Sequence, residues 1–397
     1  MKLEKMISLV TKVYFTSRVS MIFLGAPGIG KSTVIREASM KIADLLGKTW
    51  IEYDDDVAST ILANPDNYFV FNDLRLTEVD PSDLIGVPRT DSDYVSYKPL
   101  LWARVLNKCA GLLLLDEYTN VEDDTVRSVS LKLLLDRKAG YVKFSEGVMV
   151  IALGNRPEES SLAREIPAPA INRCCTIHVD PPSLESWMSW MSGEQAKIRI
   201  PKWLKNYKPK RVLLPRILAY LTTCSSDFIK LGNPETLQNF PTPRTWTLLS
   251  MTLTDRYREI FDDEEILALC TGFLGEEVGS KVYRYLTMNV PTIQELLENP
   301  EKFDDLKIDE QAIFVAMLSQ YLTNNIDSVK DEKVKRLLLK IKNTMEEFAI
   351  LLFYAAGDKK FQLAFKVVAE IPEYKEVFKR IAELRRKFEK CYSWVKN

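Results

Sequence analysis

Apolar runs and helix-like periodicity alternate along the first 180 residues of the chain. Met21–Leu24, Leu112–Leu115 and Val148–Leu153 contain no charged residue, which is typical of strands buried on both faces of a parallel sheet. Val34–Leu46 has the spacing of a helix, and Lys2–Arg18 carries an apolar stripe along one helical face. The alternation of strands and helices predicts an α/β fold with a parallel sheet.

The remainder of the chain, after Pro181-Pro182, shows mainly helical periodicity. Helices are expected at Leu184–Met191, Val212–Ile229, Pro243–Leu253, Glu264–Val282, Ala312–Leu322, Lys333–Phe353 and Val367–Trp394. Thr292 and Glu295 form a capping-box pattern that opens a further helix. The second half is therefore expected to be helical.

The composition is that of a globular chain, with 397 residues, 46% hydrophobic and 27% charged. Lys and Arg total 54 against 55 Asp and Glu, so an extended cationic surface for nucleic acid is not expected. No apolar run approaches the ~18 residues of a membrane-spanning helix, and the first residues lack a signal-peptide cleavage pattern. We expect a cytoplasmic protein with no membrane partner.

The cysteines and the histidine limit the possible metal chemistry. The six cysteines form no CxxC pair, which disfavours a zinc knuckle or a disulfide framework, and buried reduced thiols are expected. His178 is the single histidine, so two-histidine metal sites and histidine-based triads across the chain are excluded. We interpret His178 as an ordinary strand residue.

The strongest chemical signal is the sequence GAPGIGKST at residues 25 to 33, which directly follows a predicted strand and precedes a predicted helix. This context is that of a phosphate-binding P-loop, in which glycines let backbone N–H groups wrap a phosphate chain. Lys31 is expected to reach the β- and γ-phosphates, and Ser32 to ligate Mg²⁺. The residues expected to contact ATP are Gly25, Ala26, Pro27, Gly28, Ile29, Gly30, Lys31, Ser32 and Thr33.

Polar residues end two other predicted strands of the same sheet. Asp116 and Glu117 follow four leucines, and Asn155 follows Val148–Leu153. Ligands bind at the carboxyl ends of the strands in α/β folds, so Asp116 is expected to hold Mg²⁺ through water. Glu117 is placed to act as general base toward the attacking water, and Asn155 to orient that water and the γ-phosphate.

Two arginines have positions that suit a role in phosphate chemistry. Arg173 precedes the predicted strand Cys174–Val179, from where it cannot easily reach its own nucleotide, so it could serve a neighbouring subunit as an arginine finger. Arg244 follows Pro243 in the first turn of a predicted helix.

Taken together, the segments GAPGIGKS, LLLLDE, LGNRPEE, IPAPAINR and FPTPRTW resemble the MoxR-like group of AAA+ ATPases over roughly residues 1–255. The resemblance implies Walker A at Gly25–Ser32, Walker B at Leu112–Glu117 and sensor 1 at Asn155. It also implies an arginine finger at Arg173 and sensor 2 at Arg244 in cis. Arg164 is a second candidate for an arginine that acts in trans.

The stretch from Asp83-Leu84-Ile85-Gly86 through Val95-Ser96-Tyr97-Lys98-Pro99 is similar to the helix-2 insert of this group. Alternation through Tyr94–Tyr97 predicts a short strand. The group's usual PGP is missing here, and Tyr118-Thr119-Asn120 stands where Asn-Arg-Ala commonly follows Asp-Glu. These departures leave the nucleotide motifs intact.

The resemblance implies a P-loop NTPase (AAA+) core in residues 1–180 with the insert near 83–99, a helical lid in 181–285 and a helical C-terminal extension in 286–397. It implies Mg²⁺-dependent ATP hydrolysis that drives chaperone-like remodelling or maturation of a protein complex. A homo-oligomer, with a hexameric ring favoured, and a client with a von Willebrand factor A domain are expected. The alternatives are a nucleic-acid motor of the helicase or packaging type and an ATP-gated scaffold.

Two further segments leave alternatives open. Eight basic residues and no acidic residue lie between Lys197 and Arg216, interleaved with Trp203 and Tyr207. This stretch could contact another subunit or protein, form a solvated loop or bind single-stranded nucleic acid. The stripe within Lys375–Lys396 predicts a packed amphipathic helix or one that docks onto a partner subunit.

Overall fold

The computed structural model describes residues 1–90, 96–158, 160, 163–191, 198–209, 213–230 and 239–392. Contacts between Cα atoms divide the chain into two compact units. The first unit contains Met1–Lys210 and Lys230–Ser280, and the second contains Arg211–Ile229 and Lys281–Asn397. Each unit therefore consists of two separate chain segments.

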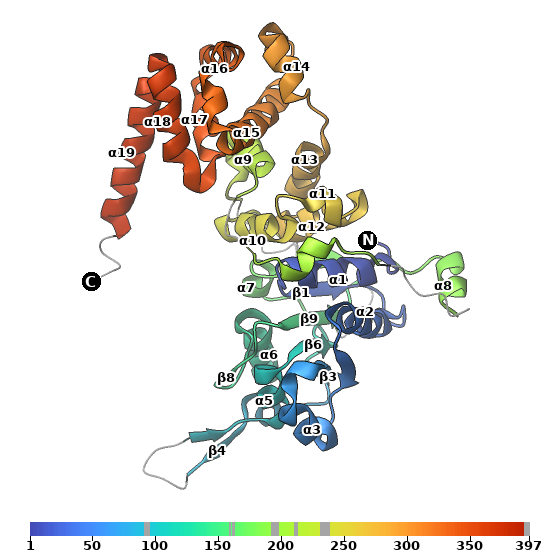
Figure 1. Cartoon of the computed structure of the whole chain (residues 1–397). Helices are drawn as coiled ribbons and strands as arrows, with labels where there is room; N and C mark the ends of the chain where they lie inside the picture. The colour runs from blue at the N-terminus through green and yellow to red at the C-terminus, as the bar shows by residue number, and fades with distance from the viewer. Residues whose placement is uncertain are drawn as a thin grey trace. The chain divides into compact units, whose positions relative to one another are not determined.

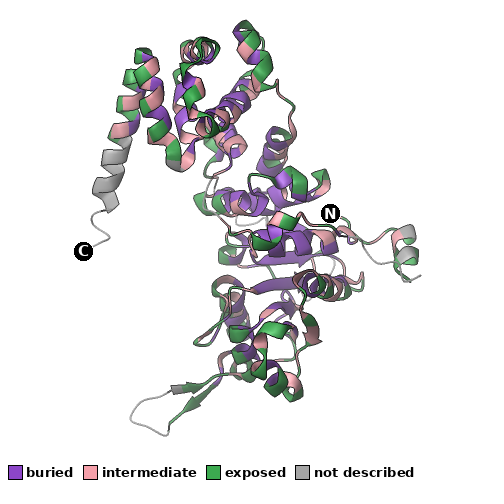
Figure 2. Cartoon of the chain, viewed as in Figure 1, coloured by how far each residue is buried: buried purple, intermediate pink, exposed green. Residues whose placement is uncertain are grey.

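The first unit is built on a six-stranded parallel sheet in the order β10-β1-β9-β6-β3-β2. The strands are β1 (Met21–Leu24), β2 (Thr49–Glu52), β3 (Tyr68–Arg75), β6 (Ala110–Asp116), β9 (Val148–Gly154) and β10 (Cys175–His178). Leu112–Leu115 and Val148–Leu153 are buried, as their apolar runs predict, and Figure 2 shows the sheet as part of the buried interior. The α/β fold class expected from the sequence is confirmed.

Helices surround the sheet of the first unit, and α8 extends to one side of it (Figure 1). They are α1 (Lys5–Thr16), α2 (Lys31–Leu46), α3 (Ala58–Ala63), α4 (Pro81–Ile85), α5 (Leu101–Lys108), α6 (Asp124–Asp136), α7 (Ala168–Ile171), α8 (Leu184–Met191), α10 (Pro243–Leu253), α11 (Tyr257–Ile260) and α12 (Asp263–Leu274). Helix α2 packs against α1, and Arg36 of α2 lies over the ring of Phe71 in β3. The bounds of α8 and α10 agree with the helices predicted from periodicity.

The long separation between Lys31 and Asp116 contains additional structure. Strand β2, the turn η1 (Asp55–Val57), helix α3 and the turn η2 (Pro65–Asn67) lie in this part of the chain. Asp54 begins the acidic run, and its side chain accepts a hydrogen bond from the Asp56 N–H at 3.0 Å. The run is exposed, as expected, and also caps η1.

Two antiparallel hairpins extend the first unit beyond the sheet. Strands β4 (Val87–Arg89) and β5 (Ser96–Lys98) form one hairpin, in the segment expected to contain the insert, and it projects away from the sheet in Figure 1. Tyr94 lies outside the described residues. Strands β7 (Lys138–Ala139) and β8 (Val142–Lys143) form the second hairpin, which the hydrophobic pattern does not predict because its strands have two residues each.

The described part of the second unit is helical. Its helices are α9 (Pro215–Thr223), α14 (Ile293–Glu298), α15 (Ile308–Asn324), α16 (Glu332–Thr344), α17 (Glu346–Tyr354), α18 (Lys360–Glu370) and α19 (Lys375–Tyr392), and α13 (Glu276–Thr287) crosses the division between the units. Helix α15 lies in its core, since six successive or near-successive apolar residues between Ala312 and Leu318 are buried. Phe314 contacts Phe303, which also contacts Phe348.

The observed grouping of helices differs from the three parts expected from the sequence. Helix α9, expected in the lid, packs on α15 of the second unit, whereas α10 and α12 belong with the sheet. Arg216 of α9 donates hydrogen bonds to the carbonyl oxygens of Tyr285 (2.9 Å) and Met288 (2.8 Å), at the end of α13. These contacts join segments far apart in sequence, which periodicity does not reveal.

A buried ion pair joins α1 to α12 within the first unit. The Lys12 Nζ lies 2.7 Å from Glu265 Oε2, and Glu265 has no exposed surface. The Ser8 hydroxyl donates to Glu265 Oε1 at 2.6 Å, and the Asp262 N–H donates to Oε2 at 2.9 Å. The carboxylate is therefore satisfied by one cation and two further donors, as a buried charge requires.

Removal of this carboxylate is expected to destabilise the first unit. Glu265→Ala leaves the Lys12 ammonium buried without its partner, and a loss of about 3–5 kcal/mol in the free energy of unfolding is expected. Urea denaturation followed by tryptophan fluorescence measures this loss. The control is Lys41→Ala, which removes an exposed pair with Asp44 and should cost less than about 1 kcal/mol. Similar losses in both variants would contradict the buried-pair assignment.

Candidate functional site

The loop between β1 and α2 has the geometry expected of a phosphate-binding loop. Gly28 and Gly30 have φ angles of 77° and 97°, in the left-handed region that glycine adopts at no steric cost. Gly30 is the N-cap of α2, and the first turn of this 16-residue helix contains no acidic side chain. The positive end of the helix dipole is therefore uncompensated beside the loop, an arrangement that favours an anion.

Lys31 connects this loop to the end of the neighbouring strand β9. Its Nζ donates hydrogen bonds to the carbonyl oxygens of Gly25 (2.7 Å) and Ala26 (2.8 Å) and to Asn155 Oδ1 (3.1 Å). Only 8% of Lys31 is exposed. The Asn155 N–H in turn donates to Thr119 Oγ1 at 2.8 Å. The structure thus brings together the lysine and the asparagine that the sequence places 124 positions apart.

Asp116 and Glu117 lie at the end of β6, the strand next to β9. The Glu117 N–H donates to Asp116 Oδ1 at 2.9 Å, and Glu117 has a φ of 57°, which is uncommon for a residue other than glycine. The Thr77 hydroxyl donates to Glu117 Oε2 at 2.6 Å. This contact fixes the carboxylate proposed as general base, and it was missed from the sequence. The only available signal was that Thr77 follows β3, the other neighbour of β6.

Asp73 of β3 adds a second carboxylate near Asp116. Burial, reinforced by the negative charge of Asp116, raises the pKa of Asp73 to about 6, while Arg36 opposes the shift. The Asp73 Oδ1 is buried and has no hydrogen-bond partner. The local field at this edge of the sheet therefore favours a cation.

The residues present fit a magnesium ion held mainly by phosphate oxygens. Within the described ranges, no group of three or more His, Cys, Asp or Glu side chains could hold a metal ion. Mg²⁺ commonly uses one or two carboxylates together with substrate phosphates and water. Asp116, with Ser32 in the first turn of α2, supplies a donor set of that kind.

The two arginines proposed for catalysis belong to segments that are joined by a hydrogen bond. Arg173 lies between α7 and β10 and is 4.0 Å from Asp136, and Arg244 is exposed in the first turn of α10. The Thr242 hydroxyl donates to Asn172 Oδ1 at 2.7 Å, which ties the two arginine-bearing segments together. In the described residues, no hydrogen bond or ion pair joins either arginine to the loop.

The alternative arginine, Arg164, is tied to the segment that follows Glu117. Its backbone N–H donates to the Thr119 carbonyl oxygen at 2.7 Å, and its guanidinium lies 3.4 Å from Asp124. The side chain is about half exposed. Arg164 therefore stays a second candidate for an arginine that acts in trans.

An apolar pocket of about 770 Å³ adjoins the glycine loop. Its walls come from α1, the loop, α2 and α8, and they include Leu3, Ile7, Ile29, Val34, Trp187 and Trp190. Typical ligand pockets have volumes of about 300–1,000 Å³ and are mostly apolar. The sequence predicts neither this pocket nor the two tryptophans in it, since α1 and α8 are widely separated along the chain.

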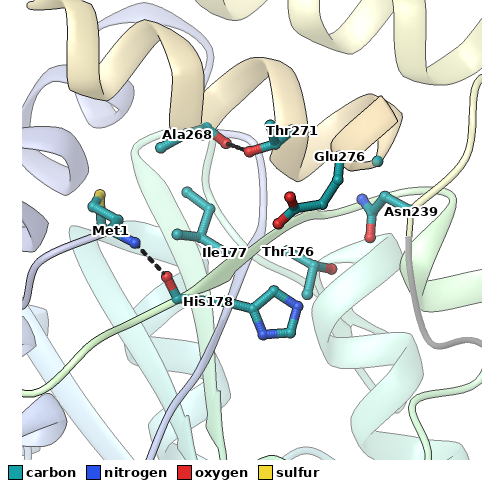
Figure 3. A pocket seen from close by; sticks show the side chains of 9 residues that line it. Met1, Thr176, Ile177, His178, Asn239, Ala268, Thr271 and Glu276 are labelled. Carbon is teal, nitrogen blue, oxygen red and sulfur yellow. Dashed lines mark hydrogen bonds between the residues drawn. The ribbon is translucent and has the colours of Figure 1, made fainter. Parts of the chain in front are cut away.

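A second pocket, of about 100 Å³, lies between β10 and the segments that contain α12 and α13 (Figure 3). Thr176 Oγ1 and Asn239 Oδ1 line it and have no hydrogen-bond partner. Burial, together with Arg156, lowers the pKa of His178, so its imidazole is neutral at pH 7. A polar pocket of this size suits a few ordered waters. His178 is the last residue of β10, in keeping with its interpretation as a strand residue.

Part of the basic stretch makes contacts within the first unit. Lys202, Lys205 and Lys208 are exposed, and η3 (Lys202–Asn206) is anchored by buried Leu204. Arg256 lies over the Trp203 ring, 4.5 Å from its centroid, and Trp203 Nε1 donates to Glu259 at 3.3 Å. This ring is thus already engaged by a cation, which disfavours it as a platform for stacked bases. Lys197, Lys210 and Arg211 lie outside the described residues.

The two hairpins present a pair of exposed aromatic rings. Tyr97 of β5 is exposed, and its ring centroid lies 5.5 Å from that of Tyr141. Tyr141 stands between β7 and β8 and is 81% exposed. Tyr141 was missed from the sequence because the hairpin that carries it was not predicted.

Two general expectations can be compared with the described residues. In these parts of the chain, no helix is both long enough and apolar enough to cross a membrane. Cys109, Cys174, Cys175, Cys224 and Cys270 are free thiols, and burial raises the pKa of Cys109 to about 11. The Cys109 thiol is therefore protonated and unreactive at neutral pH.

Comparisons with known proteins give similarities in solved structures only. No protein-family model matches the chain, and no curated protein sequence matches it. A "putative ATPase" from Cytophaga hutchinsonii is 14% identical, with a TM-score of 0.38 over 71% of this chain and 81% of that one.

Two other solved structures have lower scores. NtrX from Brucella abortus in complex with ADP is 13% identical, with a TM-score of 0.29 over 94% of this chain and 67% of that one. The FIGL-1 AAA domain in complex with ADP is 12% identical, with a TM-score of 0.24 over 76% and 85%. Similarity at this level does not assign an activity to this chain, so the function has to be argued from the site.

Proposed function

We propose that the chain is a Mg²⁺-dependent ATPase of the AAA+ type. The observation that carries this proposal is the convergence at one edge of the sheet. The neighbouring strands β1, β9 and β6 end, respectively, in the glycine loop, in Asn155 and in Asp116-Glu117. Phosphoryl transfer to water requires groups of this kind. They are a phosphate-binding loop, an amide that is hydrogen-bonded to the loop lysine, and two carboxylates.

In the proposed mechanism, the loop N–H groups and Lys31 bind the phosphate chain. Lys31 exchanges its hydrogen bonds with Gly25 and Ala26 for bonds with phosphate oxygens. Ser32 and Asp116 would hold Mg²⁺, which supplies charge neutralisation and orientation of the phosphates. Glu117 gives up its hydrogen bond with the Thr77 hydroxyl and accepts a proton from the attacking water. Asn155 orients that water.

The direct test is phosphate release by the purified chain at saturating ATP. Turnover is expected with Mg²⁺ and is expected to be lost when EDTA removes it, because Ser32 and Asp116 then have no ion through which to orient the phosphates. Restoration by added Mg²⁺ is the control for damage by the chelator. Equal rates with EDTA and with Mg²⁺ would contradict the proposal.

We propose further that catalysis is shared between subunits of a homo-oligomer, for which a hexameric ring is favoured. Arg173 serves the nucleotide of the adjacent subunit. Arg244, expected to act in cis, is tied through Thr242 to Asn172 beside Arg173. Because of this link, we propose that both arginines act on the nucleotide of the same adjacent subunit. If Arg244→Ala loses the ATPase activity, and mixing it with Lys31→Ala subunits does not restore that activity, Arg244 acts in cis instead.

The proposed output is remodelling of a partner protein complex, as the resemblance to the MoxR-like group implies, with a von Willebrand factor A domain protein as the candidate client. The alternative is a nucleic-acid motor. The exposed lysines of the basic stretch support that alternative, whereas the engaged Trp203 ring does not. A salt-titrated single-stranded DNA binding assay separates the two, because phosphate contacts weaken steeply with salt.

The aromatic pair on the hairpins is the proposed contact with this partner. Tyr97→Ala and Tyr141→Ala are each expected to keep the basal ATPase rate and to lose its stimulation by a partner recovered by co-purification from native cells. The matched control is Tyr141→Phe, which keeps the ring and should keep the stimulation. Loss of nucleotide binding in Tyr97→Ala would show that this hairpin is structural.

A further inference from the structure

We infer that Arg18 and Arg137 form a binding site for a phosphate-type oxyanion, apart from the glycine loop. Arg18 lies between α1 and β1, and Arg137 is the C-cap of α6. The inference goes beyond the proposed function, because it requires neither ATP binding nor ATP hydrolysis. It assigns a ligand to two arginines that belong to none of the motifs described above.

A hydrogen bond joins the two arginines. Nη2 of Arg137 donates to the backbone carbonyl oxygen of Arg18. The guanidinium of Arg18 lies over the Tyr14 ring, 4.9 Å from its centroid, and the Tyr14 hydroxyl donates to the Gly147 carbonyl oxygen at 2.7 Å. Both side chains are therefore held by protein groups, so a ligand meets guanidiniums that are already positioned.

Neither guanidinium forms an ion pair with a carboxylate in the described residues. Both arginines are partly buried, and burial, reinforced by the positive charge of Arg18, lowers the pKa of Arg137. A buried charge normally has a partner of opposite sign. The adjacent carboxylate, Asp136, lies instead 4.0 Å from Arg173. An anion bound at Arg18 and Arg137 would offset the repulsion between two cations that the described chain does not neutralise.

The hydrogen-bond donors of the pair fit an oxyanion. Arg18 Nε is buried and has no hydrogen-bond partner. A guanidinium carries several N–H donors in a planar fork and no acceptor, and this fork matches the oxygens of a phosphate group. A phosphate also carries more than one negative charge, which suits two guanidiniums better than a single carboxylate does. The carbonyl oxygens that end α1 and α6 supply only partial negative charge.

Both arginines have backbone conformations that favour glycine. Their φ angles are 50° for Arg18 and 52° for Arg137, which is uncommon for residues other than glycine. In Arg137 this conformation ends α6, a position at which glycine is usual. Arginine is therefore less favourable than glycine for the backbone at both positions, which indicates that the side chains have a role.

The site lies at the other end of β1 from the glycine loop. Arg18 precedes β1, the loop follows it, and a strand of this length spans roughly 13 Å. The Cys175 N–H donates to the Ser20 carbonyl oxygen at 3.1 Å, which pairs the start of β10 with the start of β1. Arg173 therefore stands at the same edge of the sheet as Arg18. The oxyanion is either free phosphate or a phosphate group of the nucleotide that an adjacent subunit holds.

Calorimetric titration with inorganic phosphate tests the site on the whole chain at a concentration at which it is monomeric. Mg²⁺ and ATPγS in excess occupy the glycine loop beforehand, and chloride keeps the ionic strength constant. The wild-type chain is expected to bind phosphate. Arg18→Ala and Arg137→Ala are each expected to bind it about tenfold or more weakly, because a charged donor is lost. Lys132→Ala is the matched control, since it removes an exposed cation of α6, and it should bind phosphate like the wild type.

The source of the oxyanion follows from the same titration on the assembled, ATPγS-bound chain. Phosphate binding that persists on assembly assigns free phosphate. Binding that is present in the monomer and lost on assembly assigns the nucleotide of the adjacent subunit. Both results support the site, because both require phosphate to bind the monomer through the two arginines.

Two results would overturn the inference. One is a wild-type chain that binds no phosphate under these conditions, and the other is an equal affinity in the wild type and Arg18→Ala. Arg18→Ala keeps the hydrogen bond from Arg137, because the acceptor is a backbone oxygen, so this variant decides the question if Arg137→Ala does not fold. A chain that binds no ATPγS would overturn the proposed function alone, since the comparison of variants still reports on this site.

Discussion

Glu117→Gln is expected to bind ATP as tightly as the parent chain and to hydrolyse it about 10²–10⁴-fold more slowly. The amide keeps the size of the side chain but cannot accept a proton from water, and general-base catalysis has this magnitude. Phosphate release in single-turnover conditions measures the chemical step, and equilibrium binding of a fluorescent ATP analogue measures affinity. The Thr77 hydroxyl can still donate to the amide oxygen, so the local structure should persist.

The matched control is Glu122→Gln, which removes an exposed carboxylate five positions further along the chain. This variant should hydrolyse ATP at the parental rate. Lys31→Ala should differ from Glu117→Gln in that it weakens ATP binding. It removes the cation that Gly25 and Ala26 hold at the loop. If Glu117→Gln turns over ATP as fast as the parent, another residue is the base.

Arg173→Ala is expected to bind ATP normally and to lose about 10³–10⁵-fold in turnover, the range typical of an arginine finger. The reason is positional, since Arg173 is exposed beside β10 and makes no bond to its own glycine loop in the described residues. Lys31→Ala subunits should also be inactive. Mixed together, the two variants form some interfaces with an intact loop and an intact arginine, so activity should partly return.

Two further measurements sharpen this test. The specific activity of the parent should rise with protein concentration, because assembly completes each site. Arg164→Ala is the comparison, since the guanidinium of Arg164 is paired with Asp124, whereas that of Arg173 lies near Asp136. A monomeric preparation with full activity would refute the shared site, as would a mixture that assembles and stays inactive. Loss of turnover in Arg164→Ala alone would transfer the role to Arg164.

The sequence predicts the parts of this fold that depend on local pattern. The apolar strands that end at Leu24, Asp116 and Gly154 were identified because they are buried on both faces, and the glycine loop because its spacing follows from phosphate geometry. Helix breaks were predicted less well. Lys333–Phe353 was expected as one helix, but it is divided into α16 and α17 around Met345. The apolar residues keep their helical spacing across this break, so the spacing does not reveal where one helix ends and the next begins.

The parts of the site that were missed depend on contacts between distant segments. Thr77 meets Glu117 because β3 pairs with β6, and Tyr141 meets Tyr97 because two short hairpins lie side by side. Arg137 meets Arg18 across 119 positions. None of these residues belongs to a motif, and their roles follow only from the topology that brings them together.

The ion pair between α1 and α12 also affects how the chain is made. Lys12 is synthesised 253 positions before its partner Glu265, which corresponds to an interval of roughly 13–50 s. During that time α1 carries an unpaired cation on the face that becomes buried. The helix therefore cannot yet pack in its final position. A nascent chain arrested before residue 262 should therefore keep α1 open to proteases, and one arrested well beyond α12 should protect it.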